Sequence, residues 1–348
     1  MSSIDAESSF DAEAKEKSLV AESTSWDVSA PVDAAPGDIP IVDVSHWFAT
    51  GSASALAAAA AVLREASERI GFFYLTGHGI DPALIEATFE ATAAFHALPH
   101  ETREKILLNG PGTDISGIGY LPFDNHMLPR RDTGNQNEAF LIKGDAAIGL
   151  DDNQWLSEAD APGFRAAVES WLDAVKGLAL RLLPLYAVAL DLPEDFFADG
   201  FTHPFFRLRF THYPPAADRT DAGKDRASAF GISPHVDTTF FTLLLQDSPG
   251  LTIHNAARDQ WINAPLIANA FVVNSGELLR QWSNDRFLST RHFANNPSAT
   301  SSRYSIPLFF NANADHPMEC LPTCYGPGNP PKYPTISYLE SQGVFQGE

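Results

Sequence analysis

Apolar residues repeat at helical spacing in the first part of the chain. The longest repeat, over 163–190, predicts an amphipathic helix that Pro184 is expected to kink or divide. An Ala-rich segment over 54–70 predicts a second helix, and Asp81 is expected to cap a third that runs to about residue 98. Two short strands are predicted beside these helices, at 39–43 and 71–75.

The spacing of apolar residues changes at Phe205, beyond which short strand-like segments alternate with turns. These segments lie at 206–213, 236–246, 251–254, 260–263, 270–274 and 304–311. Several short strands without intervening helices are typical of an antiparallel sandwich or barrel. We therefore expect a mixed α/β fold with a mainly β core, flanked by N-terminal and central helices.

Composition separates a tail from the rest of the chain. Residues 1–37 are rich in Ser, Ala and acidic side chains, which predicts a disordered or loosely docked tail. Gly and Pro are frequent over 101–160, and a loop-rich segment of this length is often a cover over an active site. Residues 38–348 are interpreted as a single domain, with a helix-rich part at 38–200, the β core at 205–312 and a C-terminal segment at 313–348.

The formal net charge is −21, from 44 acidic and 23 basic residues. Nucleic acid and anionic membrane surfaces are therefore excluded as expected partners, because binding them needs clustered Lys and Arg. We interpret the acidity as a solubility feature. For a small-molecule partner, it favours a neutral or cationic metabolite slightly over a polyanion.

The sequence shows no secretory signal and no apolar run long enough to span a bilayer, so a cytoplasmic protein is expected. Cys320 and Cys324 are too few for a disulfide framework and are interpreted as ordinary thiols in a reducing compartment. No coiled-coil seam is recognisable, and a monomer is assumed.

A His-x-Asp motif, His235 and Asp237, is followed by His292. The segment 233–245 is rich in β-branched and aromatic residues and is interpreted as one strand. Residues i and i+2 of a strand face the same way, so His235 and Asp237 are expected to point into one cavity, to which the fold must bring His292. Two imidazoles and one carboxylate leave other metal positions open, as in non-haem Fe(II) sites that activate oxygen. An isolated His-x-Asp also arises by chance, and spacing does not prove a third ligand.

A second pair, Arg303 and Ser305, begins the apolar strand 306–310 and shares one face of it. A guanidinium beside a hydroxyl is a good receptor for a carboxylate, because the planar fork donates two parallel hydrogen bonds and the hydroxyl a third. Phe309 lies on the same face if no bulge intervenes. The alternative is that this common pair is a surface or structural feature.

Tyr213 ends a predicted strand, in which Arg209 shares its face. The alternative for Tyr213 is a strand-end aromatic residue anchored by the prolines that follow. Arg207 and Arg209 are unusual in an apolar strand and need partners if buried. We expect them to form structural ion pairs rather than substrate contacts.

Taken together, the chain resembles the Fe(II)/2-oxoglutarate-dependent dioxygenases of the isopenicillin N synthase-like branch. The motifs that carry the resemblance follow the family's order over about 38–340. They are IPIVD at 39–43, IGFFYL at 70–75, GHGI at 77–80, FHALP at 95–99, HYPP at 212–215, HVD at 235–237, TLLLQD at 242–247, VVNSGE at 272–277, WSN at 282–284, STRH at 289–292 and RYSIP at 303–307.

The resemblance implies a double-stranded β-helix, a jelly-roll barrel with iron at its mouth, as the fold of the single catalytic domain. It implies Fe(II) ligation by His235, Asp237 and His292. It implies that the distal carboxylate of 2-oxoglutarate is held by Arg303, Ser305 and Tyr213. Phe309 becomes a candidate for lining the substrate.

The implied reaction couples oxidative decarboxylation of 2-oxoglutarate by O2 to oxidation of an unactivated C–H bond in a small metabolite. Succinate and CO2 are the co-products, and the outcome is hydroxylation, desaturation or ring closure. No separate catalytic acid or base is expected, because the protein contributes positioning and exclusion of water.

Three positions depart from the family's frequent pattern: Phe293 replaces an Arg, Asp285 a Gly and Thr211 an Asn. Two alternatives stay open on the sequence. One is an oxidase of the isopenicillin N synthase type, which uses the same iron ligands without 2-oxoglutarate. The other is a catalytically silent barrel that serves as a binding module, for which absence of Fe(II) binding would be evidence.

Overall fold

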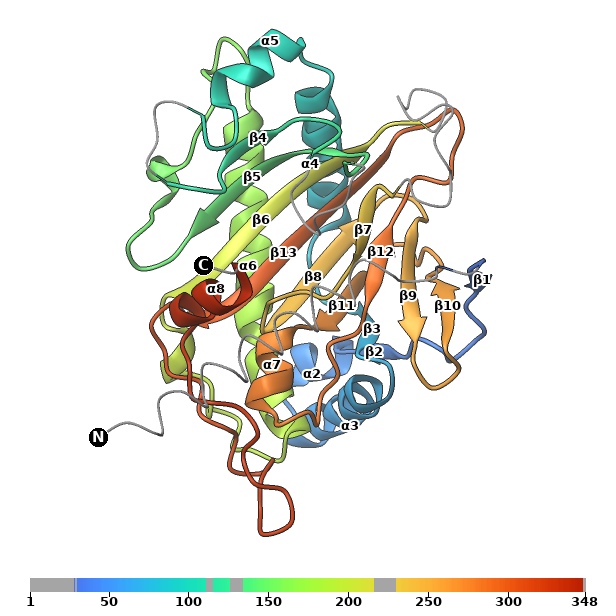
Figure 1. Cartoon of the computed structure of the whole chain (residues 1–348), viewed down its shortest axis with the longest axis vertical. Coiled ribbons are helices and arrows are strands. Elements are labelled where there is room, and N and C mark those ends of the chain that lie inside the picture. Colours follow the sequence, from blue (N-terminus) through green and yellow to red (C-terminus); the bar gives the residue numbers. More distant parts are fainter. Residues whose placement is uncertain (1–27, 29, 111–114, 126–133, 216–229, 347–348) are drawn as a thin grey trace, which may run out of the picture.

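The computed structural model describes residues 28, 30–110, 115–125, 134–215 and 230–346 of the chain. Two β-sheets form its core, and helices pack against the larger one (Figure 1). The strands are β1 (Val32–Asp33), β2 (Ile41–Asp43), β3 (Phe72–Thr76), β4 (Gly119–Leu121), β5 (Glu138–Gly144), β6 (Pro204–Tyr213), β7 (Ile232–His235), β8 (Phe241–Gln246), β9 (Leu251–Asn255), β10 (Gln260–Asn263), β11 (Phe271–Ser275), β12 (His292–Ala294) and β13 (Arg303–Asn313).

Helices lie on both faces of the larger sheet (Figure 1). They are α2 (Ser45–Thr50), α3 (Ala53–Arg69), α4 (Pro82–His96), α5 (His100–Arg103), α6 (Phe164–Ala189), α7 (Glu277–Trp282) and α8 (Tyr338–Gln346), with short 3-10 turns at Glu104–Ile106, Leu150–Asp152 and Asp199–Phe201. The expected mixed α/β, sheet-rich fold is confirmed.

The larger sheet has eight strands in the order β2-β3-β11-β8-β13-β6-β5-β4, and only β2 and β3 run parallel. The long strand β13 pairs with β6 and β8 without a register shift from Arg303 to Phe310. Because side chains alternate along a strand, Arg303, Ser305 and Phe309 share one face of this sheet. We call it the site face.

The smaller sheet has five strands in the order β1-β10-β9-β12-β7, which are antiparallel except for β1 and β10. Its strand β12 lies between β9 and β7, and this pairing places His292 directly opposite His235. Two histidines that are far apart in the sequence therefore meet on neighbouring strands.

The long helix α6 runs behind β6 and β13 and contacts α3, α4 and β13 (Figure 1). It is continuous through Pro184, so the expected division does not occur. Proline removes one backbone hydrogen bond, but the buried neighbours Leu183 and Leu185 hold this turn in the core. Tyr186 stacks on Phe241 of β8, with ring centroids 4.9 Å apart.

The predicted helix cap at Asp81 is confirmed, whereas the predicted strand over 233–245 is not. Asp81 does cap α4, since its carboxylate accepts the N–H of Ala83 at 2.9 Å. The single strand is wrong, because β7 ends at His235 and β8 begins at Phe241 in the other sheet. The chain changes sheets over 236–240, so the ladder must break there.

Several expectations concern residues whose structure is described only in part. Residues 1–27 and 29 of the predicted tail lie outside the described residues, as do 111–114 and 126–133 of the loop-rich segment. Val32–Asp33, at the end of the predicted tail, form β1 and pair with β10. Sheet pairing therefore begins before residue 38.

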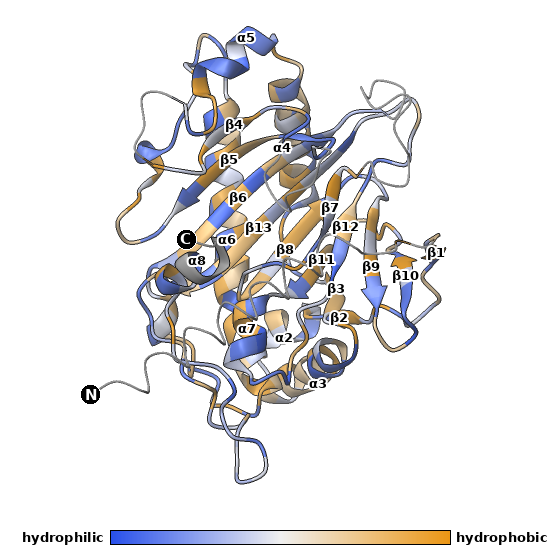
Figure 2. Cartoon of the chain, in the orientation of Figure 1, coloured by the Kyte–Doolittle hydropathy of each residue, from blue (hydrophilic) through white to orange (hydrophobic). Residues whose placement is uncertain are grey.

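The strands of the larger sheet differ in hydropathy. Figure 2 shows apolar residues along β8 and β11, whereas hydrophilic bands cross β6. Among the described residues, no helix combines the length and the apolar content that crossing a membrane requires.

Candidate metal and cosubstrate site

His235, at the end of β7, and His292, at the start of β12, form a cross-strand pair with ring centroids 4.4 Å apart. Asp237 follows β7 in the segment that crosses between the sheets. Its Oδ1 lies 3.5 Å from His235 Nε2 and 3.7 Å from His292 Nε2. The structure thus brings all three predicted residues together, although the i, i+2 strand argument for the first two is wrong.

Hydrogen bonds orient both imidazoles. His235 Nδ1 lies 2.8 Å from the carbonyl of Ser233, and His292 Nδ1 lies 3.0 Å from that of Thr290. A carbonyl only accepts, so each Nδ1 carries a proton, and in the neutral imidazole Nε2 is then the atom with a lone pair on the side of Asp237. This is the tautomer that a metal-ligating histidine needs.

Asp237 is held in the same manner from its other oxygen. Its Oδ2 accepts hydrogen bonds from Thr242 Oγ1 at 2.7 Å and Asn274 Nδ2 at 2.8 Å. Oδ1 therefore remains for the space between the histidines. Thr242 and Asn274 were not predicted from the sequence as partners of Asp237. Each is a polar residue within an apolar strand, and that pattern could have identified them.

Burial and charge together set the protonation of this group. Burial alone would raise the pKa of Asp237, but the nearby His292 and His235 and the Asn274 amide outweigh it and hold this pKa well below its usual range. Burial, followed by the neighbouring His235, lowers the pKa of His292 to about 4. At neutral pH, the ionised Asp237 carboxylate therefore faces a neutral His292 imidazole. A carboxylate and a neutral imidazole can both ligate a metal.

The donor set fits a divalent transition metal. The ligand atoms of His235, Asp237 and His292 all lie within 4.8 Å of one another. Two imidazole nitrogens and one carboxylate oxygen are the facial set of non-haem Fe(II) oxygenases, with positions left for further ligands.

Arg303 lies on the site face and is only 1% exposed. Its Nη2 donates to Gln246 Oε1 at 2.9 Å and its Nε to the carbonyl of Ser248 at 3.3 Å. The third nitrogen, Nη1, is buried with no partner among the described residues. A buried guanidinium with an unused donor fits a carboxylate that belongs to a bound molecule.

Ser305 and Tyr213 lie beside Arg303 and form a cluster of polar groups with it. The Tyr213 hydroxyl lies 3.4 Å from Ser305 Oγ, and the Arg303 guanidinium lies over the Tyr213 ring at 4.6 Å. Thr211 pairs with Ser305 across β6 and β13, and its buried hydroxyl has no partner among the described residues. The three residues predicted to hold one carboxylate therefore lie side by side.

Comparison with known proteins agrees with this geometry. Residues 202–312 match the model of the 2OG-Fe(II) oxygenase superfamily, and residues 39–158 match that of the non-haem dioxygenase in morphine synthesis N-terminal region. A 2-oxoglutarate-Fe(II) type oxidoreductase of Emericella nidulans is 35% identical over 317 residues, which are 87% of this chain and 88% of the relative. The chain belongs to the 2-oxoglutarate/Fe(II) oxygenase family. It is thus an oxidoreductase that uses Fe(II), 2-oxoglutarate and O2.

Other members of the family support the same assignment. A 2-oxoglutarate-dependent dioxygenase of Monascus ruber is 31% identical over 300 residues, covering 81% of this chain and 87% of that one. Among solved structures, a full-length Neurospora crassa protein in complex with alpha-KG and thymine superposes with a TM-score of 0.77 at 27% identity, over 90% of this chain and 99% of that one.

The departures from the family pattern have local explanations in this oxygenase. Phe293 packs against Phe230 and Trp261, with ring centroids 5.1 Å away in each case. Asp285 has φ of 68°, a left-handed conformation that favours glycine. Hydrogen bonds from Lys332 Nζ at 2.9 Å and the Tyr333 hydroxyl at 2.7 Å hold its carboxylate there.

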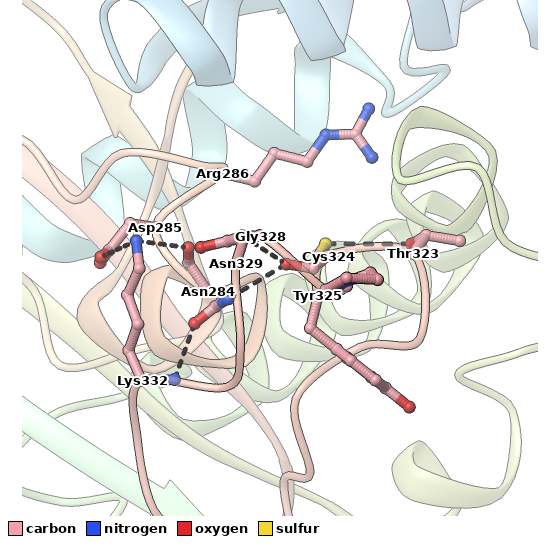
Figure 3. A pocket seen from close by; sticks show the side chains of 11 residues that line it. Asn284, Asp285, Arg286, Thr323, Cys324, Tyr325, Gly328, Asn329 and Lys332 are labelled. Atoms are coloured by element: carbon pink, nitrogen blue, oxygen red, sulfur yellow. Dashed lines mark hydrogen bonds and ion pairs between the residues drawn. The ribbon is translucent and has the colours of Figure 1, made fainter.

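Asp285 also lines a surface pocket of about 570 Å³ on the C-terminal segment. Figure 3 shows its lining, in which Lys332 bonds Asn284 and Asp285. None of the predicted metal or cosubstrate residues lines it.

The expected ion pairs of Arg207 and Arg209 are absent from the described part of the chain. Arg209 donates instead to a neutral partner, Asn137 Oδ1, at 2.5 Å. Arg207 lies beside Phe309 on the site face, in β6–β13 register. Both arginines have a buried Nε without a partner, and no carboxylate among the described residues pairs with either side chain.

A second cluster of possible metal ligands, His96, Glu138 and His212, lies on the opposite face of the large sheet. Its carboxylate is already occupied: one oxygen of Glu138 accepts from Arg103 and Tyr120, and the other lies 2.8 Å from His212 Nδ1. This saturation makes the cluster a structural network.

Replacing this carboxylate tests that interpretation. Glu138→Gln should lower the free energy of unfolding by about 3 kcal/mol at neutral pH, because Arg103 loses a buried partner. Burial opposes ionisation of Glu138, but His212, His96 and Tyr120 outweigh it, and the pKa lies far below its ordinary value of 4.5. Its stabilisation is therefore present above pH 4.5 and is lost as the pH falls below it. Urea unfolding should show the difference between the two proteins narrowing below pH 4.5; a constant difference would contradict the network.

Proposed function

We propose that His235, Asp237 and His292 hold Fe(II) in this chain. The observation that carries the proposal is the convergence of two Nε2 atoms and Asp237 Oδ1, with every other polar atom of the three side chains engaged by Ser233, Thr290, Thr242 or Asn274. Such supporting hydrogen bonds are the usual surroundings of metal ligands.

The cosubstrate's distal carboxylate is held by Arg303, Ser305 and Tyr213. The unpartnered Nη1 of Arg303 supports this assignment, because a buried donor without an acceptor costs free energy until a ligand supplies one. The buried hydroxyl of Thr211 beside Ser305 offers a further donor.

With Fe(II), 2-oxoglutarate and O2 bound, the site would catalyse the oxidation of an unactivated C–H bond, with succinate and CO2 as co-products. The chain's own residues bind and orient. Arg303 fixes the cosubstrate, Phe309 lines the space for the primary substrate, and the apolar strands exclude water. No side chain is required as a separate acid or base.

The fold that we propose for residues 38–348 is a double-stranded β-helix forming one catalytic domain, preceded by the acidic tail. Two mainly antiparallel sheets, with both candidate metal-binding histidines at strand ends, support it. The thymine in the Neurospora crassa complex supports a small-molecule primary substrate. A monomeric, cytoplasmic protein without a nucleic-acid partner remains the prediction from composition.

The decisive experiment couples two measurements on the Fe(II)-loaded protein. O2 consumption and succinate formation should both require 2-oxoglutarate and should rise together when a primary substrate is added. Substrate oxidation without 2-oxoglutarate would instead identify an oxidase, and failure of anaerobic Fe(II) binding would identify a silent binding module.

A further inference from the structure

Three cationic side chains lie together on the site face, beyond Phe309. Lys143 of β5 pairs with Arg207 of β6, and Arg209 follows two residues along the same strand. Strand alternation gives all three the orientation of Phe309, which pairs with Arg207 from the other side. We call this set the cation cluster.

No carboxylate among the described residues forms an ion pair with the cation cluster. The Arg207 side chain makes no hydrogen bond within this part of the chain, and the Arg209 side chain bonds only the Asn137 amide oxygen. Asp145, whose charge acts on Lys143, forms no ion pair with it and accepts the N–H groups of Ala147 and Ile148 in its own turn, at 2.7 and 2.9 Å.

Three like charges on neighbouring strands are unfavourable without a counter-charge. Burial and, next, the Arg207 charge lower the pKa of Lys143. Burial also lowers the pKa of Arg209, and the Arg207 charge adds to this shift. All three side chains are only partly buried. An anion from outside the chain would satisfy the cluster.

The register of the sheet gives the position of the cluster relative to the metal residues. Asn274 and Thr242, which hold Asp237, lie in one row across the strands with Phe309, Arg207 and Lys143. Neighbouring strands are about 4.8 Å apart, so the Arg207 backbone lies about 10 Å from that of Thr242. Phe309 lies between the two.

We propose that the primary substrate carries a carboxylate, bound by Arg207, Arg209 and Lys143, and an apolar body that packs on Phe309 and points toward His235, Asp237 and His292. Two guanidinium forks suit a planar carboxylate. The inference rests on the proposed function. It reverses the preference for a neutral or cationic substrate, because the local charge of the site is opposite to the net charge of −21.

The first test compares acids with uncharged molecules of the same shape. Benzoate, phenylacetate, 3-phenylpropanoate and hexanoate are titrated by calorimetry against the Fe(II)-loaded protein under anaerobic conditions, beside their primary amides. Saturating 2-oxoglutarate keeps the Arg303 pocket occupied. At least one acid should bind roughly 10- to 100-fold more tightly than its amide, the range for a charged hydrogen bond. Equal binding of acids and amides throughout would overturn the proposal.

The second test uses variants of the cation cluster and measures both acid binding and the thermal midpoint. A structural role and a binding role predict opposite shifts of that midpoint. Arg207→Gln and Lys143→Gln should each bring the affinity for the best acid close to that of its amide. They should also raise the thermal midpoint of the ligand-free protein, since each removes an uncompensated charge. A lowered midpoint with unchanged acid binding would make the cluster structural and sink the proposal.

Lys105→Gln is the matched control, because Lys105 is an exposed cation already paired with Asp160. It should leave acid binding unchanged. Failure of the proposed function and failure of carboxylate binding at the cation cluster are distinguishable. Loss of the proposed function would appear as absent Fe(II) or 2-oxoglutarate binding, whereas the acid titrations can still be made on the metal-free chain and would test the cation cluster alone.

Discussion

Asp237→Asn is expected to abolish Fe(II) binding and 2-oxoglutarate turnover while leaving the fold intact. The amide oxygen can take the place of Oδ2 and accept from Thr242 and Asn274. The amide nitrogen then faces the two histidines, where it has no lone pair to offer a metal. Loss of one supporting hydrogen bond at a metal site costs about 10- to 100-fold, so loss of the ligand should exceed about 100-fold in both affinity and turnover.

Anaerobic Fe(II) titration and succinate formation measure this effect, with urea unfolding of the metal-free protein as a check on folding. Thr242→Val should give an intermediate loss of about 10- to 100-fold, since it removes one hydrogen bond to Oδ2 and keeps the ligand. Asp259→Asn, at an exposed carboxylate, is the control and should change neither measurement. If Asp237→Asn retains metal and turnover, Asp237 is not a ligand.

The candidate site was predictable as a set of residues but not as a geometry. His235, Asp237 and His292 come together because β7 pairs with β12 and the chain then leaves the sheet. The strand period that suggested a common face for the first two does not apply across such a break. Residue types carried the chemistry, and long-range pairing, which a local pattern does not contain, carried the arrangement.

The strand β13 shows the opposite case. Arg303, Ser305 and Phe309 do share a face, because their strand has no register shift before Phe310. A regular central strand makes the local period sufficient. Among the helices, the predicted cap at Asp81 is confirmed. The division expected as one outcome at Pro184 does not occur, because buried neighbours hold the helix continuous there.

Arg207 and Arg209 illustrate what burial patterns alone leave open. Because the sequence places two arginines in an apolar strand, we expected them to form ion pairs within the fold. Whether a charge is met by the chain or by a ligand depends on what the neighbouring strand presents. Here β5 presents Lys143, a like charge.

The second large effect is expected for Arg303→Gln, which should raise the KM for 2-oxoglutarate far more than it lowers kcat at saturating cosubstrate. Removing one partner of a buried charge pair costs about 2–5 kcal/mol, or roughly 30- to 4,000-fold in affinity. Arg303→Lys keeps the charge but loses the fork, so its KM should lie between those of the wild type and Arg303→Gln. Fe(II) affinity without 2-oxoglutarate should be unchanged.

Comparing the change in the KM for 2-oxoglutarate with the change in the KM for the primary substrate shows which of the two molecules Arg303 binds. Tyr213→Phe removes only a hydroxyl 3.4 Å from Ser305 Oγ and should raise the KM for 2-oxoglutarate by a few fold, consistent with one neutral hydrogen bond. Arg258→Gln, at a half-exposed arginine paired with Asp38, is the matched control and should alter neither KM. If Arg303→Gln instead raises the KM for the primary substrate and leaves that for 2-oxoglutarate unchanged, the guanidinium is turned toward the substrate. The carboxylate pocket would then be shared with, or replaced by, the cation cluster at Arg207, and titration of the acid panel on Arg303→Gln would show which.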